Sequence, residues 1–546
     1  MAYSRLPRWR RISQIFFLVF FLGLLIFTAL RPIPGATSDI HLLAPVRLFF
    51  EIDPLIAISN AIAGHALYRG LLLCLVILIP TLFLGRFFCG WICPMGTLQH
   101  FFGNMPSESK RGKQRLESNR YKRWQTIKYV VLIAGLVSAA FGSMAIGWLD
   151  PFSLLVRSVG LSILPGFNYA VRAVLAPFEQ SHIALVKSAA ENTHSVLQVL
   201  LLDFRQTRFS QGLVLGILFL LILAASLRVT RLWCRSICPL GALLGFVSRW
   251  SVLGLHKNPD NCNQCNRCLL NCQGGDNPIG GVPWRKAECL MCMNCVGACP
   301  SDGLAFRFFR KEPEVVSADL GRRRAFTGLA AGAVAVPLMR ANTGLGKGRN
   351  ERLLRPPGAL DESDFLSRCI RCGECMKVCP NNSLHPTLAE AGIEGLWTPK
   401  LVPRIGYCEP SCVLCSEVCP TGAIWKLTPQ EKGWVVGVGS GSQPVRLGLA
   451  FYDKGRCLPW AMATDCIVCE EWCPVSPKAI YVQEAQVVDS AGNTKTLKQP
   501  RVDPNRCVGC GACEYACPLQ DRPAVYVTSI GESRSPSSQI LLNRKS

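Results

Sequence analysis

Cysteine is the residue type whose number and spacing point most directly to chemistry in this sequence. The chain has 546 residues, and 24 of its 29 cysteines fall into six groups of four. Numbered one to six in chain order, the groups are Cys262, Cys265, Cys268 and Cys272; Cys289, Cys292, Cys295 and Cys299; Cys369, Cys372, Cys375 and Cys379; Cys408, Cys412, Cys415 and Cys419; Cys457, Cys466, Cys469 and Cys473; and Cys507, Cys510, Cys513 and Cys517.

Groups one, two, three and six have the spacing C-x2-C-x2-C-x3-C. In bacterial ferredoxins this spacing lets three thiolates hold one 4Fe-4S cubane while the fourth ligates the neighbouring cubane. Zinc ribbons instead separate two C-x2-C knuckles by a long insertion. Disulfides are an alternative for groups three to six if that part is exported, but the repeated spacing favours clusters. The sequence therefore predicts six 4Fe-4S clusters.

Three groups depart from the regular pattern. Cys272 is followed by Gln273, whereas a proline follows the last cysteine of every other group. Group four has three residues between Cys408 and Cys412, and group five has eight between Cys457 and Cys466. Insertions of this kind change the solvent exposure and the local electrostatics of a cluster. Both properties affect its reduction potential.

Four further cysteines lie in an internal repeat. The segments 86–98 and 231–243 both contain a C-x3-C-P motif, with Cys89 and Cys93 in the first and Cys234 and Cys238 in the second. Two parallel repeats would bring both cysteine pairs to the same cytoplasmic face. Three interpretations remain open for these thiols: a seventh iron–sulfur cluster held jointly, two redox-active dithiols, or structural thiols.

Asp53 and Asp150 occupy matching positions in the two repeats, each directly before a proline. They are weak candidates for relaying protons when quinol is oxidised, as acidic groups at membrane depth often do. An Asp-Pro pair is also a strong helix start, with Asp as the N-cap and Pro in the first turn. We favour the capping role.

Four apolar segments are long enough to be transmembrane helices, at residues 12–30, 70–88, 129–149 and 209–227. Arginines before the first segment and a basic run from Lys110 to Lys128 after the second predict a cytoplasmic N-terminus. Val159–Phe178 is apolar but interrupted by proline, glycine and charge, and we interpret it as interfacial or re-entrant. We therefore expect an α-helical membrane bundle with four spans and a two-fold internal repeat, followed by α+β ferredoxin-like domains.

The net charge of +23 would suggest nucleic-acid binding in a soluble protein. Here the basic residues gather in loops beside apolar segments, so we attribute them to membrane topology and expect no nucleic-acid partner. The sequence contains no C-x-x-C-H haem site and no nucleotide-binding loop.

Arg323 and Arg324 lead into a short stretch rich in alanine and glycine. This pattern is typical of a twin-arginine export signal, here placed internally; a basic linker to a buried helix is the alternative. The expected domains are a membrane domain (1–252), a cytoplasmic two-cluster domain (253–310), a linker with the signal or tether (311–350), a four-cluster domain (351–530) and a tail (531–546).

These motifs resemble known families. Residues 1–300 are similar to NapH-type membrane quinol dehydrogenase components, whose signature MauN, CcoG and part of NosR share. Residues 320–530 resemble the exported ferredoxin-type proteins NapG and MauM. The resemblance implies a fusion that takes electrons from the membrane quinone pool and delivers them to a periplasmic oxidoreductase or cytochrome. By resemblance to other four-cluster subunits, we expect nested pairing of the outer groups, three with six and four with five.

We therefore expect an iron–sulfur electron-transfer protein of the bacterial inner membrane, with its four-cluster domain in the periplasm. One alternative is a redox accessory or maturation factor for a metalloenzyme, with no quinol oxidation of its own. Another keeps all six groups in the cytoplasm, with residues 320–340 not crossing the membrane.

Overall fold

The computed structural model describes residues 6–28, 47–65, 69–105, 112–200, 202, 206–258, 260–280, 282–309, 320–344, 350–434, 444–488 and 492–534. The end of the first predicted span (29–30), residues 311–319 and 345–349 of the expected linker, and the tail beyond residue 534 lie outside the described residues. The chain forms two compact units. The first contains Met1–Ile26, Pro45–Val159 and Leu213–Pro337, and the second contains Phe27–Ala44, Gly160–Gly212 and Leu338–Ser546.

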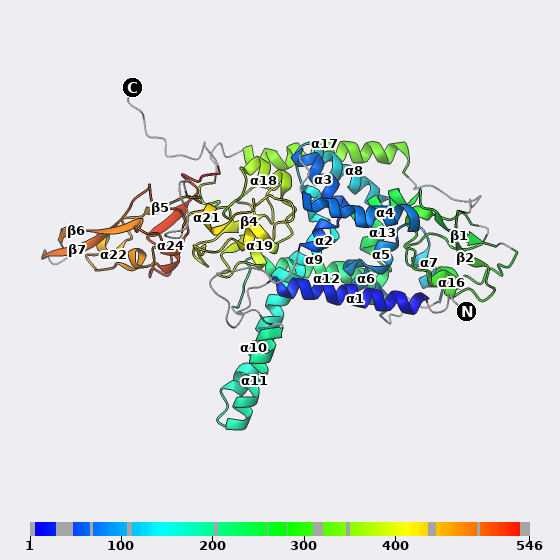
Figure 1. Ribbon diagram of the computed structural model, residues 1–546, viewed down its shortest axis with the longest axis horizontal. Helices are drawn as coiled ribbons and strands as arrows, with labels where there is room; N and C mark the ends of the chain where they lie inside the picture. Colours follow the sequence, from blue (N-terminus) through cyan, green and yellow to red (C-terminus); the bar gives the residue numbers. More distant parts are fainter. Residues whose placement is uncertain are drawn as a thin grey trace. The chain divides into compact units, whose positions relative to one another are not determined.

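The first unit is built mainly from helices, with one small sheet (Figure 1). The helices before the sheet are α1 (Leu6–Phe27), α2 (Leu48–Glu51), α3 (Pro54–Gly64), α4 (Leu75–Leu84), α5 (Phe87–Trp91), α6 (Pro94–Asn104), α7 (Gly112–Asn119), α8 (Ile127–Ala140), α9 (Pro151–Ser158), α12 (Gly212–Arg228), α13 (Leu232–Ser236) and α14 (Pro239–Ser248).

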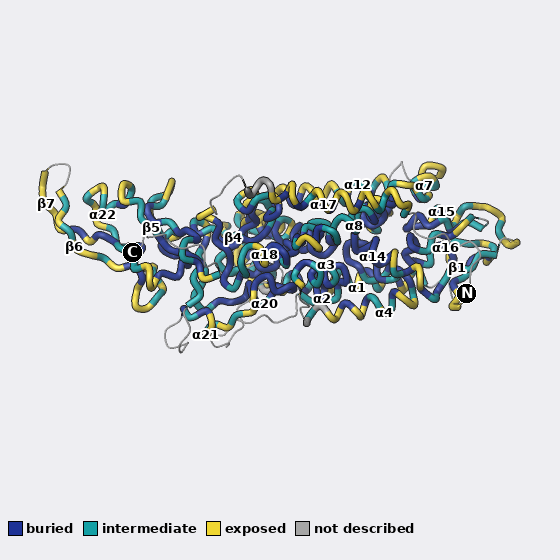
Figure 2. The backbone as a smooth tube through the Cα atoms, turned by 90° about the horizontal axis from the view of Figure 1, so that it is seen from above, coloured by how far each residue is buried: buried dark blue, intermediate teal, exposed yellow. Residues whose placement is uncertain are grey.

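Apolar side chains cover both the inside and parts of the outside of this unit. Helix α14 packs against α4 and α8, and most of its residues are buried. In contrast, α4 and α12 carry exposed positions along one side (Figure 2), including Leu75, Val76, Leu213 and Leu221. Contiguous exposed apolar faces of this kind mark surfaces that contact lipid or another protein.

Two helical stretches are long and apolar enough to cross a membrane, Leu6–Phe27 and Pro151–Glu179. The other predicted spans correspond to shorter helices, α4, α8 and α12, of 10, 14 and 17 residues. The interfacial segment predicted at Val159–Phe178 lies instead within a continuous helix. A π-helical turn at Val159–Ile163 precedes Pro165 and lets the helix continue past this proline.

A small two-stranded domain follows the helices of the first unit. Strand β1 (Leu253–Lys257) pairs antiparallel with β2 (Leu304–Phe308), with Leu253 opposite Phe308. Two short helices lie between the strands, α15 (Arg267–Leu270) and α16 (Asn294–Gly297). Trp284 is buried in the core between the strands and the cysteine loops.

The twin-arginine segment forms helix α17 (Arg322–Gly344). Gly328 and Gly332 lie on its buried side, where an added Cβ would come within 3.0 Å of Ile133 and 2.6 Å of the Ala134 carbonyl oxygen. Helix α17 therefore packs closely on α8, and the missing side chains permit the approach.

The second unit combines two longer helices and several short ones with three antiparallel strand pairs, β3–β4, β5–β8 and β6–β7. Its elements are α10 (Leu164–Glu179), α11 (Ala184–Leu200), α18 (Glu362–Arg368), α19 (Glu374–Lys377), β3 (Leu384–Pro386), β4 (Pro399–Leu401), α20 (Leu414–Glu417), α21 (Pro429–Lys432), β5 (Leu449–Tyr452), α22 (Leu458–Ala461), α23 (Val468–Glu471), β6 (Ile480–Val488), β7 (Thr494–Val502), α24 (Ala512–Ala516) and β8 (Val525–Thr528).

Candidate iron–sulfur sites

The four regular cysteine groups share one unusual backbone conformation. In each group, the residues directly before and after the second cysteine have positive φ: Gln264 and Asn266, Met291 and Met293, Arg371 and Gly373, and Gly509 and Gly511. Five of these eight residues are not glycine, although only glycine adopts positive φ without steric cost. Alternation between right- and left-handed conformations turns successive N–H groups toward one point and creates a concavity that binds anions.

Groups four and five lack this feature among the described residues. In these groups, the residue directly after the second cysteine has negative φ. It is Val413 in group four, with φ of −128°, and Ile467 in group five, with φ of −124°. These are the two groups with the longer insertions, so their irregular spacing corresponds to a different loop conformation.

The thiols of groups one and two assemble with exchange of the last cysteine. One small cavity is lined by Cys262, Cys265 and Cys268 together with Cys299 from group two. Cys272 instead interacts with Cys292, which in turn lies beside Cys289 and Cys295. Each set thus contains three cysteines of one group and the fourth of its neighbour, the arrangement known from two-cluster ferredoxins.

The outer groups pair in consecutive order. Cys369, Cys372 and Cys375 line a cavity with Cys419 of group four, and Cys408, Cys412 and Cys415 line another with Cys379 of group three. In groups five and six, Cys517 lies near Cys457 and Cys469, whereas Cys473 lies near Cys507, Cys510 and Cys513. The nested pairing expected from the resemblance is therefore wrong: each group exchanges its last cysteine with its neighbour along the chain.

Burial makes these thiols poor thiolates by themselves. It raises the pKa of Cys268 and Cys469 to about 11 and that of Cys412 to about 12. A bound metal displaces such protons and stabilises the thiolate. Among the described residues, no three His, Cys, Asp or Glu side chains converge on a single-ion site.

Two charged side chains beside the thiols could not be recognised from the sequence. The Lys432 ammonium group donates to Cys408 Sγ at 3.4 Å and to the Cys412 carbonyl oxygen at 2.8 Å, and Lys432 is fully buried. Asp276 accepts a hydrogen bond from Cys272 Sγ at 2.7 Å and also contacts Cys289. Neither residue lies within a cysteine motif, and no spacing rule signals them.

The four C-x3-C-P cysteines also form one buried set. Cys93 and Cys238 each interact with Cys89 and Cys234, and all four are less than 8 % exposed. Cys93 and Cys238 are the N-caps of α6 and α14, with the following proline in the first turn. The sulfur of Cys238 accepts a hydrogen bond from Gly241 N at 3.3 Å.

Two buried arginines cross between the C-x3-C-P segments. Arg231 Nη1 donates to the carbonyl oxygen of Cys89 at 2.7 Å. Arg86 lies beside Cys89. Arg86 also reaches the other segment, because a Cβ added to Gly241 would lie 2.9 Å from Arg86 Nη2. Nε and Nη2 of both arginines have no hydrogen-bond partner among the described residues. Four thiols beside buried, unpartnered donors fit a negatively charged cluster, because the donors would otherwise be costly to bury.

Asp53 and Asp150 are helix caps, as favoured from the sequence. Asp53 Oδ1 accepts from Leu55 N at 2.7 Å, and Asp150 Oδ2 accepts from Ser153 N at 2.7 Å. The two carboxyl groups also contact each other, and both residues are fully buried. One proton shared between their remaining oxygens would satisfy both groups.

The two-cluster domain is fixed to the helices of the first unit. Trp91 Nε1 donates to the Met291 carbonyl oxygen at 2.9 Å, and Arg86 Nη1 donates to that of Ala287 at 3.1 Å. Lys128 forms a buried ion pair with Glu288. These contacts lie directly beside Cys289 and Cys292. The segment after Cys272 is held in the same way, since Arg10 Nη1 donates to Gln273 Oε1 at 3.3 Å.

Comparison with known protein families agrees with this geometry. A 4Fe-4S binding domain model matches twice, at residues 66–114 and 211–258, and both matches include a C-x3-C-P motif. A 4Fe-4S dicluster domain matches residues 464–520, and further 4Fe-4S binding domains match 365–385 and 286–305.

Several characterised proteins are similar to parts of the chain. The methylamine utilization ferredoxin-type protein MauM of Methylorubrum extorquens is 36% identical over 174 residues, 31% of this chain and 69% of that protein. The ferredoxin-type protein NapG of Escherichia coli K12 is 34% identical over 32% of this chain and 69% of its own length. A putative electron transport protein of the same bacterium, YccM, is 28% identical over 42% of this chain and 53% of its own.

No solved structure matches the chain. The relatives and the domain matches agree on several 4Fe-4S binding domains in one polypeptide. The chain belongs to the family of ferredoxin-type iron–sulfur electron-transfer proteins that includes MauM and NapG.

Proposed function

We propose that this protein carries electrons from membrane quinol, through a series of 4Fe-4S clusters, to a redox partner in the periplasm. The observation that carries the proposal is the assembly of six thiol sets in three consecutive pairs, each pair joined by exchanged cysteines. When clusters are bound, they supply reversible one-electron transfer. The protein's own residues hold the thiols in place, bury them and set the surrounding charge.

The six groups would hold six clusters, one for each set of thiols described above. We propose a seventh at Cys89, Cys93, Cys234 and Cys238. The burial of all four thiols and the unpartnered nitrogens of Arg86 and Arg231 support it. The two guanidinium groups would offset negative charge that four thiolates bring into a buried site.

Iron analysis tests whether the protein holds seven clusters. Wild-type protein purified without oxygen should contain about 28 iron atoms, four for each of seven clusters. The double variant Cys234→Ser/Cys238→Ser should lose about four of them and leave the other signals unchanged. A wild-type content of about 24 iron atoms, unchanged in the double variant, would exclude the seventh cluster.

We further propose that α1, α4, α8 and α12 cross the inner membrane, that the helix Pro151–Glu179 lies at the interface without crossing, and that α17 carries the chain to the periplasmic side. The exposed apolar faces of α1, α4 and α12 support membrane insertion. Close packing of α17 on α8 through Gly328 and Gly332 supports its retention as a tether. A reporter enzyme fused after Ser546 should be active in the periplasm, and cytoplasmic activity would overturn this topology.

Electron transfer itself is tested in membranes under anaerobic conditions. Menadiol should reduce the clusters of the wild-type protein, seen as bleaching of the visible absorbance and as low-temperature EPR signals. If dithionite reduces the clusters and menadiol does not, the protein does not accept electrons from quinol, and a maturation role becomes the better explanation.

A further inference from the structure

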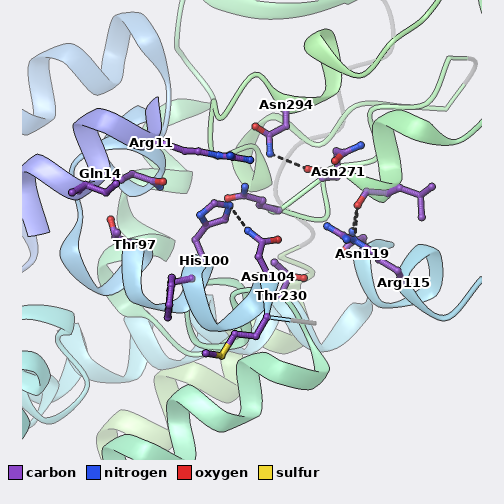
Figure 3. Close-up of a pocket in the computed structure, with 16 residues that line it drawn as sticks. Arg11, Gln14, Thr97, His100, Asn104, Arg115, Asn119, Thr230, Asn271 and Asn294 are labelled. Atoms are coloured by element: carbon purple, nitrogen blue, oxygen red, sulfur yellow. Dashed lines mark hydrogen bonds between the residues drawn. The ribbon is translucent and has the colours of Figure 1, made fainter. Parts of the chain in front are cut away.

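A cavity of about 620 Å³ opens in the first unit beside the two-cluster domain (Figure 3). Residues from α1, α6 and α7 form its walls together with the loop that contains Cys272. The described lining residues include Arg11, Arg115 and His100 but no Asp or Glu. The cavity is therefore rich in hydrogen-bond donors and positively charged.

Several of the polar lining residues are fixed by hydrogen bonds to the main chain. Gln14 Nε2 donates to the Gly90 carbonyl oxygen at 2.7 Å, and Arg115 Nε donates to that of Leu270 at 3.1 Å. Asn119 Nδ2 donates to the carbonyl oxygens of Leu269 and Leu270 at 3.1 and 2.9 Å. These contacts join α1 and α7 to their neighbours, so the walls are preformed.

His100 has a defined role in this lining. Asn104 Nδ2 lies 2.7 Å from His100 Nε2, and both side chains face the cavity in Figure 3. An amide nitrogen can only donate, so Nε2 accepts and the hydrogen of the neutral imidazole is on Nδ1. Burial and the nearby arginines hold the pKa of His100 at about 2, which keeps the ring neutral. The ring therefore offers one N–H donor to a ligand oxygen.

The rim of the cavity is apolar. Ile15, Phe101 and Met105 line it and are 60%, 62% and 40% exposed. Ile15 continues an exposed apolar stripe along α1 that includes Ile12, Phe16 and Val19. A ligand with a polar ring and an apolar tail would place the ring among the donors and the tail along this stripe.

Cys272 also lines the cavity, and it belongs to the set formed with Cys292. We propose that this cavity binds the headgroup of a quinone or hydroquinone, and that electrons enter the protein at the thiol set containing Cys272. This inference rests on the proposed function, because it names the place where quinol would be oxidised. It locates that place beside the two-cluster domain and away from Asp53 and Asp150, which serve as helix caps.

In the proposed redox step, hydroquinone would be the reductant and 4Fe-4S clusters would be the oxidant. Hydroquinone would lose two electrons, one at a time, to two oxidised 4Fe-4S clusters, the first of them held by the thiol set that contains Cys272. Both of its O–H bonds break, both carbon–oxygen bonds become carbonyl bonds, and the two protons pass to water. Positive charge from Arg11 and Arg115 stabilises the hydroquinone anion and so favours loss of the first proton.

The test measures binding and reduction separately in full-length protein. The probe for binding is 2-heptyl-4-hydroxyquinoline N-oxide, a quinone analogue whose fluorescence is quenched when it binds. His100→Leu and Arg11→Gln should each weaken its binding by about tenfold, the loss expected for removal of one hydrogen bond or one favourable charge that contacts the ligand. His100→Asn retains an N–H donor near Nδ1 and should recover part of the affinity.

Matched controls are Arg8→Gln, on an exposed position of α1 outside the cavity, and His182→Gln, on an exposed loop. Both should bind the analogue as the wild type does. All variants should contain wild-type amounts of iron and be fully reduced by dithionite, while His100→Leu should slow reduction by menadiol by about tenfold.

Two outcomes would overturn the inference and are distinguishable from failure of the proposed function. If menadiol reduces wild type and His100→Leu equally fast, quinol is oxidised elsewhere. If Arg11→Gln reduces the amount of co-purified anionic phospholipid and leaves analogue binding unchanged, the cavity is a lipid site. If menadiol fails to reduce even the wild type, the proposed function itself is wrong.

Discussion

The ammonium group of Lys432 lies 3.4 Å from the sulfur of Cys408, although 24 residues separate them in the chain. Helix α21 positions this lysine, and its start is secured by a capping box between Thr428 and Glu431. Lys432 also donates to the carbonyl oxygens of Glu409 and Cys412, so its position is fixed from three directions. A positive charge is therefore held against the irregular loop of group four.

We predict that Lys432→Met lowers the midpoint potential of the cluster bound by Cys408, Cys412, Cys415 and Cys379. A nearby positive charge stabilises the reduced form, so its removal should shift the potential by on the order of −60 mV, one tenfold change for a one-electron couple. EPR-monitored redox titration measures the shift. Lys426→Met, at an exposed position of the same segment, should leave every potential unchanged.

Iron loss in paired cysteine variants tests the consecutive exchange of thiols. Cys372 and Cys419 line the same cavity, whereas Cys412 lines the other one. We therefore expect Cys372→Ser/Cys419→Ser to lose about four iron atoms and Cys412→Ser/Cys419→Ser to lose about eight. Equal losses in the two double variants would contradict the exchange between groups three and four.

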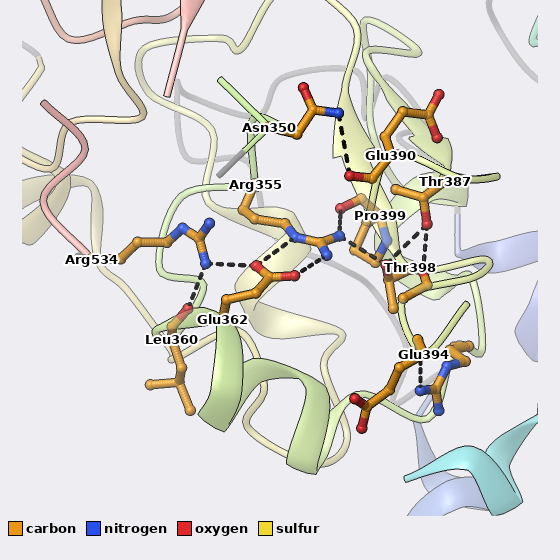
Figure 4. Close-up of polar contacts among 12 residues, drawn as sticks. Asn350, Arg355, Leu360, Glu362, Thr387, Glu390, Glu394, Thr398, Pro399 and Arg534 are labelled. Atoms are coloured by element: carbon orange, nitrogen blue, oxygen red, sulfur yellow. Dashed lines mark hydrogen bonds and ion pairs between the residues drawn. The ribbon is translucent and has the colours of Figure 1, made fainter. Parts of the chain in front are cut away.

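Glu362 joins two distant parts of the second unit (Figure 4). Its carboxylate accepts hydrogen bonds from Arg355 at 2.5 and 3.2 Å and from Arg534 Nη1 at 3.0 Å. Burial raises the pKa of Glu362, but the charges of Arg355 and Arg534 more than offset this effect and hold it at about 2. Arg534 thereby fastens the end of the described chain to α18.

This depressed pKa predicts a pH-dependent stability. A group whose pKa falls on folding stabilises the protein above the unfolded pKa of 4.5, and this contribution is lost as the pH falls toward 2. Glu362→Gln should therefore lower the free energy of unfolding of this region at pH 7 by on the order of 2 kcal/mol. The difference in the free energy of unfolding between Glu362→Gln and the wild type should shrink as the pH falls below about 4.5.

Pulse-labelling hydrogen exchange of the α18 amides, read by mass spectrometry, measures this effect. Asp364→Asn changes an exposed carboxylate on the same helix and serves as the control. A difference between Glu362→Gln and wild type that persisted unchanged to low pH would contradict the ion-pair explanation.

Larger side chains on the buried face of α17 should separate it from α8. A Cβ on Gly332 would lie 2.7 Å from that of Val137, so Gly332→Leu should destabilise the helix pair by roughly 1–3 kcal/mol, as overpacking does. The measurement is the thermal midpoint of the detergent-solubilised protein. Ala331→Leu adds the same side chain at an exposed position and should leave that midpoint near the wild-type value.

Local patterns in the sequence predicted local features of the structure. Asp53 and Asp150 begin helices because an Asp-Pro pair carries both the cap and a preset φ. The regular cysteine spacing predicted iron–sulfur binding domains, and the family matches confirm them. Each of these features depends on residues within one turn or loop of each other.

Features that depend on distant residues were not predicted. Which group supplies the fourth thiol is decided by the path of the chain between groups, so spacing within Cys408–Cys419 does not reveal it. The contacts of Glu362 with Arg534 and of Lys432 with Cys408 likewise arise only after folding. The length of the helix through Pro165 was also missed, because a π-turn compensates locally for an interruption that normally ends a helix.

The backbone of Gly90 approaches the carbonyl oxygen of Leu290 so closely that a Cβ would lie 2.2 Å from it. The two-cluster domain is thus seated on the helices without a solvent layer at this point. Electrons that pass between these parts would need no collision or docking event. Their transfer rate should accordingly be insensitive to viscosity, ionic strength and protein concentration, unlike delivery by a diffusing ferredoxin.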